Sequence, residues 1–190
     1  MKTDLITVSS RNDQIGEVLR QVDKTASYKD LSGKSALHLR LLAEEMMGMM
    51  RAITGDKEGE FWIEDHNGLF ELHLLVDTRM DFMQREQLLS AATSGKNEAN
   101  RGLMGKIRSF FEPIEGLPMF FNMPQEMNEG LSWSMSVYQS ELMQAVAQHR
   151  QGADEAWDEL EKSVIAHVAD EIKVYIRDTS TELIVYKKLA

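Results

Sequence analysis

Few side chains in this sequence have the type and spacing needed to bind a metal ion or a phosphate. Asp65 and His66 are adjacent and His73 follows soon after, so a metal site is the first chemistry to consider. Their spacing matches no recurrent ligand pattern, and the chain has no cysteine to supply a thiolate. Residues 93–96 (Thr-Ser-Gly-Lys) lack the earlier glycine that a phosphate-binding loop requires. We therefore expect surface histidines on a hairpin, a polar loop at residues 93–96 and no metal site.

Two carboxylates occupy positions from which they could act on a ligand. Glu45 lies in a methionine-rich helical segment, where it is either a catalytic base or a solvated carboxylate. Asp77 ends the apolar run Leu-Leu-Val, a place where Asp also starts turns. Met49 lies one helical turn after Glu45, on the same face of the predicted helix.

Helices and strands that would position these residues follow from the hydrophobic periodicity. Residues 35–53 form an amphipathic helix in which Met46 and Met49 are expected in the core, whereas Met47 and Met50 fit either a core or an adaptable binding surface. Strands at 60–65 and 69–76 are joined around Asn67-Gly68, a strong hairpin signal. The other predicted elements are a strand at 5–9, a helix from about 15 to 26, a helix at 156–168 and strands at 172–176 and 182–186.

The stretch at about 80–155 is interpreted as an insertion, either a lid or a subdomain, within a single domain spanning residues 1–190. It is expected to contain helices at 84–92, 102–111 and 141–149, and a strand in which apolar residues alternate with serines from Leu131 to Val137. Its aromatic and apolar side chains either close a small satellite core or form a contact patch, and they are Phe120, Phe121, Met123, Trp133 and Tyr138.

The element order and two motifs resemble the histidine-kinase-like (GHKL) ATPases, most closely the anti-sigma-factor kinase branch. In that family a Glu on the first ATP-site helix polarises the attacking water, and an Asn one turn later holds Mg²⁺. Glu45 matches the acidic position, with Glu44 as the neighbouring alternative, so the Asn position is Met49 or Gly48. Asp77 matches the Asp that accepts a hydrogen bond from adenine.

The sequence departs from the family pattern at the remaining positions. Both glycines that follow the adenine-binding Asp are replaced, because the chain reads Asp-Thr-Arg-Met-Asp from Asp77 onward. The glycine-rich phosphate loop before the last helix is replaced by Leu-Glu-Lys-Ser at residues 160–163, and the glycines at 102 and 105 stand too early unless the segment after them is inserted. The resemblance thus implies a two-layer α/β sandwich with an altered nucleotide pocket.

Composition restricts the partners of the chain. The formal net charge is −10, from 31 acidic and 21 basic side chains, so phosphate backbones and anionic membrane surfaces are repelled. A partner with a basic face is favoured instead. Absence of cysteine, of a signal-peptide pattern and of any long apolar window predicts a cytoplasmic protein in a bacterium-like cell, with no nucleic-acid or membrane binding.

These observations combine into one prediction of fold and two of function. The fold is α+β, a two-layer α/β sandwich with a mixed, mostly antiparallel sheet and helices on one face. The first function is a non-catalytic regulatory or protein-interaction domain, anti-sigma-factor-like, which binds a protein partner or a second copy through the insertion or the open sheet face. The alternative is an ATP- or ADP-binding protein with weak ATPase or serine kinase activity, using Asp77, Glu45 and Mg²⁺ near Met49.

Overall fold

The computed structural model describes residues 1–9, 14–54, 58–77, 131–176 and 180–189 of the chain. In chain order, these residues form β1 (Ile6–Ser9), α1 (Ile15–Tyr28), α2 (Gly33–Thr54), β2 (Glu58–His66), β3 (Leu69–Asp77), β4 (Leu131–Ser134), α5 (Met135–Ala147), α6 (Ala153–Lys162), α7 (Val164–Val168), β5 (Glu171–Ile176) and β6 (Ser180–Lys188). Within these ranges no helix has the length and apolar character needed to span a membrane.

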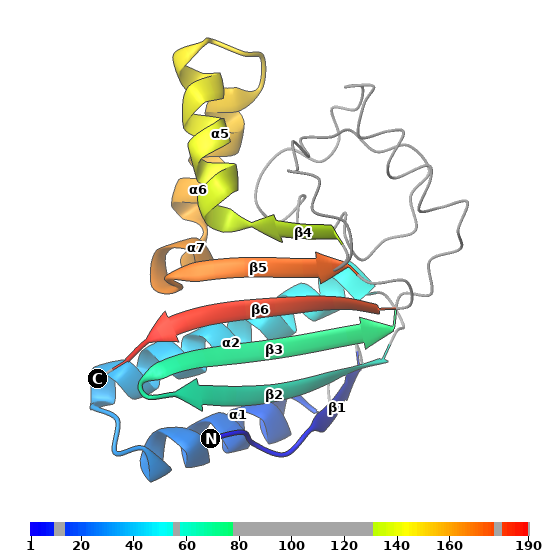
Figure 1. The fold of residues 1–190 in the computed structure, drawn as a ribbon, viewed down its shortest axis with the longest axis vertical. Coiled ribbons are helices and arrows are strands. Elements are labelled where there is room, and N and C mark those ends of the chain that lie inside the picture. The colour runs from blue at the N-terminus through cyan, green and yellow to red at the C-terminus, as the bar shows by residue number, and fades with distance from the viewer. Residues whose placement is uncertain (10–13, 55–57, 78–130, 177–179, 190) are drawn as a thin grey trace.

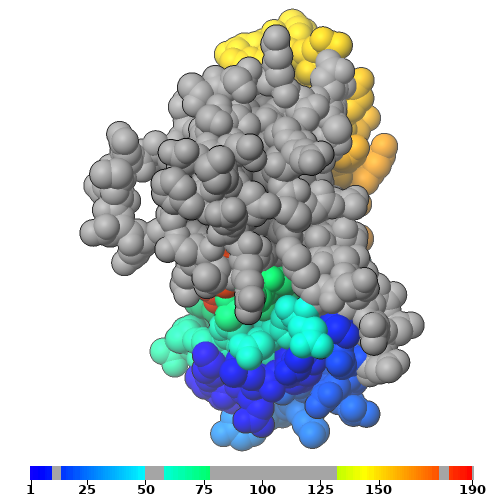
Figure 2. Space-filling model, turned by 90° about the vertical axis from the view of Figure 1, so that its right-hand side faces the viewer, coloured from blue at the N-terminus to red at the C-terminus, as the bar shows by residue number. Residues whose placement is uncertain are grey.

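One sheet contains all six strands, in the order β1-β2-β3-β6-β5-β4. Every neighbouring pair is antiparallel. α1 and α2 cover one face of the sheet, whereas the α5–α6 hairpin projects beyond β4 and β5 (Figure 1). The view along the sheet in Figure 2 places the N-terminal elements at one end of the molecule and this hairpin at the other. The predicted α+β two-layer sandwich is confirmed, with a sheet that is antiparallel throughout the described strands rather than mixed.

The core lies between the sheet and the helix pair α1–α2. Alternation along β2 and β3 turns one set of side chains toward the helices, while helical spacing on α2 turns its apolar stripe toward the sheet. Met46 and Met49 are fully buried, as predicted, and Met47 is buried as well. Other fully buried large side chains of this layer include Leu39, Leu42, Phe61, Ile63, Phe70, Leu72 and Leu74.

The β2–β3 hairpin has the geometry that its sequence predicts. Asn67 and Gly68 have φ angles of 57° and 90°, as a type I′ turn requires. The Gly68 N–H donates to Asp65 Oδ1 at 2.8 Å, and Lys29, the C-cap residue of α1, forms an ion pair with the same carboxylate. Burial raises the pKa of Asp65, but Lys29 and the Gly68 N–H outweigh burial and hold it below its usual range. Asp65 therefore ties the hairpin to α1.

Two boundaries differ from the sequence prediction. The strand expected to continue to Val137 ends at Ser134, because the Ser134 hydroxyl accepts a hydrogen bond from the Val137 N–H at 3.3 Å and caps α5. The single helix expected at 156–168 is divided into α6 and α7 at Ser163, whose backbone is extended and whose hydroxyl accepts from the Ala166 N–H.

Part of the predicted insertion is described by the structure. β4 pairs with β5 in the main sheet, and Trp133 and Tyr138 belong to the same buried cluster as α2. The predicted helices at 84–92 and 102–111, the loop at 93–96 and the residues Phe120, Phe121 and Met123 lie outside the described residues.

Candidate functional site

The two carboxylates expected to contact a nucleotide lie on β3 and α2. Asp77 is the last residue of β3, exposed, and in register with Ser180 of β6. Glu45 is half-buried near the middle of α2. α2 crosses behind the strands, and its C-terminal end lies at the end of the sheet where β3 ends (Figure 1).

Met49, the position at which the resemblance requires a magnesium ligand, belongs to the core. Its side chain is 2% exposed and packs in the cluster that fills the space between α2 and the sheet. In the alternative register the acid is Glu44, which instead forms an ion pair with Arg40 at 3.1 Å. Arg40 also contacts Asp23 of α1 at 2.7 Å. Glu44 therefore belongs, through Arg40, to the ion-pair contact between the two helices.

Residues 160–163, which stand where a phosphate loop would lie, form the junction between α6 and α7. Glu161 accepts a hydrogen bond from the Trp157 indole at 2.8 Å. α7 has only five residues, and Ser163 already caps it. The glycines at 102 and 105 lie outside the described part of the chain.

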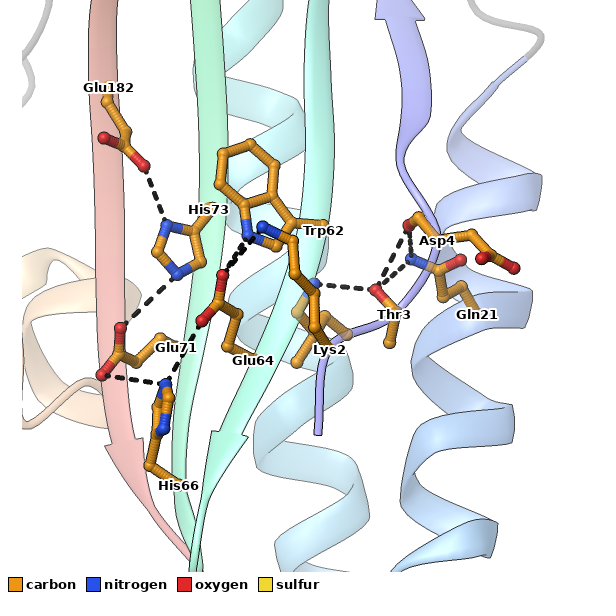
Figure 3. Close-up of polar contacts among 11 residues, drawn as sticks. Lys2, Thr3, Asp4, Gln21, Trp62, Glu64, His66, Glu71, His73 and Glu182 are labelled. Atoms are coloured by element: carbon orange, nitrogen blue, oxygen red, sulfur yellow. Dashed lines mark hydrogen bonds and ion pairs between the residues drawn. The ribbon is translucent and has the colours of Figure 1, made fainter.

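A second group of polar residues lies on the sheet face opposite α1 and α2, and the sequence did not single it out as a site. The strand register aligns three rows across β2, β3 and β6, in each of which the side chains share this face. These rows are Glu60, Leu75 and Glu182; Trp62, His73 and Ile184; and Glu64, Glu71 and Tyr186. Figure 3 shows Trp62, Glu64, Glu71, His73 and Glu182 in front of the strands, with the helices behind.

His73 is at the centre of this face and is only 6% exposed. Its Nδ1 lies 3.0 Å from Glu182 Oε1, and its Nε2 lies 3.5 Å from Glu71 Oε2 (Figure 3). Nε2 is buried and has no hydrogen-bond partner among the described residues. The imidazole stacks on Trp62, with ring centroids 4.6 Å apart and an interplanar angle of 8°. The prediction of a surface histidine is therefore wrong for His73, because a neighbouring ring and side chains from the adjacent strands enclose it.

His66, by contrast, is on the surface as predicted, with its side chain 56% exposed. Its Nε2 lies 3.3 Å from Glu64 and 4.0 Å from Glu71. The Glu71 carboxylate therefore stands between two imidazoles. Nowhere in the described residues are three or more His, Asp or Glu side chains arranged to hold a metal ion.

Glu64 is the most strongly perturbed acid on this face. The Trp62 indole N–H donates to its Oε1 at 2.9 Å, and Lys2 Nζ lies 3.0 Å from the same oxygen. The Trp62 hydrogen bond, followed by Lys2, lowers the pKa of Glu64 to about 2. Lys2 Nζ also lies 4.7 Å from the centroid of the Trp62 ring, so a single cation contacts both the acid and the indole face.

β5 and β6 add further aromatic and charged groups to this face. Tyr186 is half-buried, and burial, followed by Tyr175 and Glu71, raises its pKa above the usual range. Lys173 Nζ lies 5.4 Å from the Tyr186 ring centroid. Chemically, the face offers carboxylates and aromatic rings, which are groups that bind cationic side chains.

Cross-strand neighbours, and not linear spacing, unite this cluster. Trp62, Glu71 and His73 stand at alternate positions of the two hairpin strands, so the hairpin prediction already placed them on one face. Glu182 joins them only through the pairing of β3 with β6.

A scan against protein-family models and a search of curated proteins both find no match to this chain.

Proposed function

We propose that this chain is a non-catalytic regulatory or protein-interaction domain, built on a degenerate histidine-kinase-like ATPase fold and anti-sigma-factor-like in role. One observation supports this proposal above the others, namely that Met49 is a buried core residue. A magnesium-dependent nucleotide site of this family needs an oxygen ligand one turn after the catalytic acid. A thioether packed between the helix and the sheet fills that place with apolar volume.

In this proposal the chain acts in the cytoplasm of a bacterium and binds another protein, and a second copy of the chain is the alternative partner. Enzymatic activity is not part of the proposed role. The net charge of −10 favours a partner with a basic surface and disfavours nucleic acid.

Binding of ATP or ADP, with weak ATPase or kinase activity, is the second candidate function. It is favoured by Asp77, which is exposed at the end of β3, and by Glu45, which is only half-buried on α2. An adenine hydrogen bond to Asp77 needs no magnesium, so nucleotide binding without hydrolysis would lie between the two functions.

A thermal-unfolding titration distinguishes these functions. The protein is heated with ATP, ADP or GTP, each with and without Mg²⁺, alongside the Asp77→Asn variant. A ligand at a hundredfold excess over its dissociation constant stabilises the folded state by about 2.7 kcal/mol, which raises the melting temperature by several degrees. We expect no shift with any nucleotide. An adenine-specific shift that Asp77→Asn abolishes would establish nucleotide binding, and dependence of that shift on Mg²⁺ would refute the non-catalytic proposal outright.

A further inference from the structure

We propose that the open sheet face, defined by the three rows across β2, β3 and β6, binds a basic segment of a partner protein, and that a Lys or Arg of this segment contacts Glu71 beside His73. This inference rests on the proposed function and assigns a partner chemistry to it. The described helices leave this face uncovered, since α1 and α2 lie on the opposite face (Figure 1).

Charge is the first argument for a basic partner. The rows carry the carboxylates of Glu60, Glu64, Glu71 and Glu182. The described residues place fewer ammonium groups on this face, namely those of Lys2, Lys173 and, by its pairing with Leu69 at the end of β6, Lys188. This excess of acid adds to a chain charge of −10. A second copy of the same face is therefore repelled, and a cationic segment is attracted.

The unpartnered nitrogen of His73 is the second and independent argument. His73 Nε2 is buried and has no hydrogen-bond partner among the described residues, and Glu71 Oε2 lies 3.5 Å from it. The Glu71 side chain is 19% exposed, so an ammonium or guanidinium group can reach its carboxylate from solvent beside this nitrogen. Such a cation would bring a charge-assisted hydrogen bond to a carboxylate whose nearest imidazole nitrogens lie 3.5 and 4.0 Å away.

Lys2 shows within the chain how a cation binds to this face. Its Nζ lies on the Trp62 ring while bonded to Glu64, and Lys173 lies over Tyr186 in the same manner. A partner cation at Glu71 would lie between these two positions and near the same rings. Leu75 and Tyr175, both half-buried, add apolar surface to the face, so the partner segment should alternate basic and apolar residues, as an extended strand does.

The chain's own tryptophans provide the test. The probe is a short synthetic peptide of alternating Arg and Leu, with an alternating Glu and Leu peptide as the charge control. ¹H–¹⁵N spectra report the indole N–H of Trp62, which donates to Glu64, and that of Trp157, which donates to Glu161 on the acidic helix α6. We expect the Arg peptide to shift the Trp62 signal saturably and to leave the Trp157 signal unchanged. The Glu peptide should shift neither signal.

Two single-charge variants make the test specific. Glu71→Gln should weaken binding of the Arg peptide about tenfold, the scale of one lost charge-assisted hydrogen bond. Glu155→Gln removes an equal charge from an exposed position of α6 and should leave the affinity unchanged. Melting temperatures of both variants, measured without peptide, establish that each is folded.

Three results would overturn the inference: no shift of Trp62, equal shifts of Trp62 and Trp157, or equal loss of affinity in the two variants. The last two would mean that the peptide is held by net charge alone. If the peptide test fails and no nucleotide shifts the melting temperature, this face is excluded as the binding site for a basic segment, and the proposal of a non-catalytic function is unaffected. A magnesium-dependent nucleotide shift, in contrast, refutes that function whatever the peptide does.

Discussion

Replacing Met49 by the amide that the resemblance requires tests whether this position is core or site. Loss of a fully buried Met side chain costs about 2–5 kcal/mol, and burying an amide without a partner costs about 1–3 kcal/mol. Because Asn fills part of the volume, we expect Met49→Asn to lower the free energy of unfolding by about 4 kcal/mol. For a chain of this length, that loss corresponds to a fall in melting temperature of roughly 10 °C.

Urea denaturation, followed by circular dichroism, measures this change, and melting with ATP and Mg²⁺ tests for a gained site. Gly48→Asn is the matched control for the change in stability alone, because Gly48 is exposed and, apart from its own helix backbone, no described atom lies within 4 Å of the position its Cβ would take. It should stay within about 0.5 kcal/mol of wild type. A Met49→Asn protein as stable as Gly48→Asn, or one stabilised by ATP only with Mg²⁺, would refute the assignment of Met49 to the core.

Two further perturbations follow from the strands. The pKa of Glu64 is lowered to about 2 by Trp62 and Lys2. The ionised carboxylate therefore stabilises the fold fully above the unfolded-state pKa, and this contribution is lost as pH falls from there to the folded-state pKa of about 2. Glu64→Gln should therefore be less stable than wild type by about 1–2 kcal/mol at pH 6, and in acid melts this difference should close below about pH 4.5; a constant difference would contradict the argument. A Cβ at Gly59 would lie 2.7 Å from the Leu75 carbonyl oxygen, so Gly59→Ala should destabilise by about 1–3 kcal/mol in urea. Gly16→Ala, in the exposed surface of α1, should instead stabilise by about 0.5–1 kcal/mol.

Local patterns in the sequence predicted most of the elements around the candidate site. The helical spacing of Leu39, Leu42, Met46 and Met49 is sufficient to predict both α2 and its buried face, since periodicity and burial coincide there. The Asn67-Gly68 pair predicts the hairpin because few residues other than Asn and Gly adopt positive φ at both positions. The local pattern misled at Ser134, where alternation continues in the sequence but a serine cap begins a helix.

The site itself was less predictable, for a physical reason visible at His73. A histidine at an outward position of a hairpin strand is ordinarily solvated, and nothing in its immediate sequence indicates burial. Its hydrogen-bond partner Glu182 is 109 residues away, and only the insertion of β6 beside β3 brings the two together.

By itself, the sequence determined the α+β class, the amphipathic helices, the hairpin and the net acidic charge. Each of these depends on residue type and on spacing along the chain, which local sterics and hydrophobic burial translate directly into structure. Tertiary structure alone decided that His73 is buried and that Glu182 joins Trp62, Glu71 and His73 in one cluster. Strand order and register set those contacts, and both depend on the packing of segments that are remote in sequence.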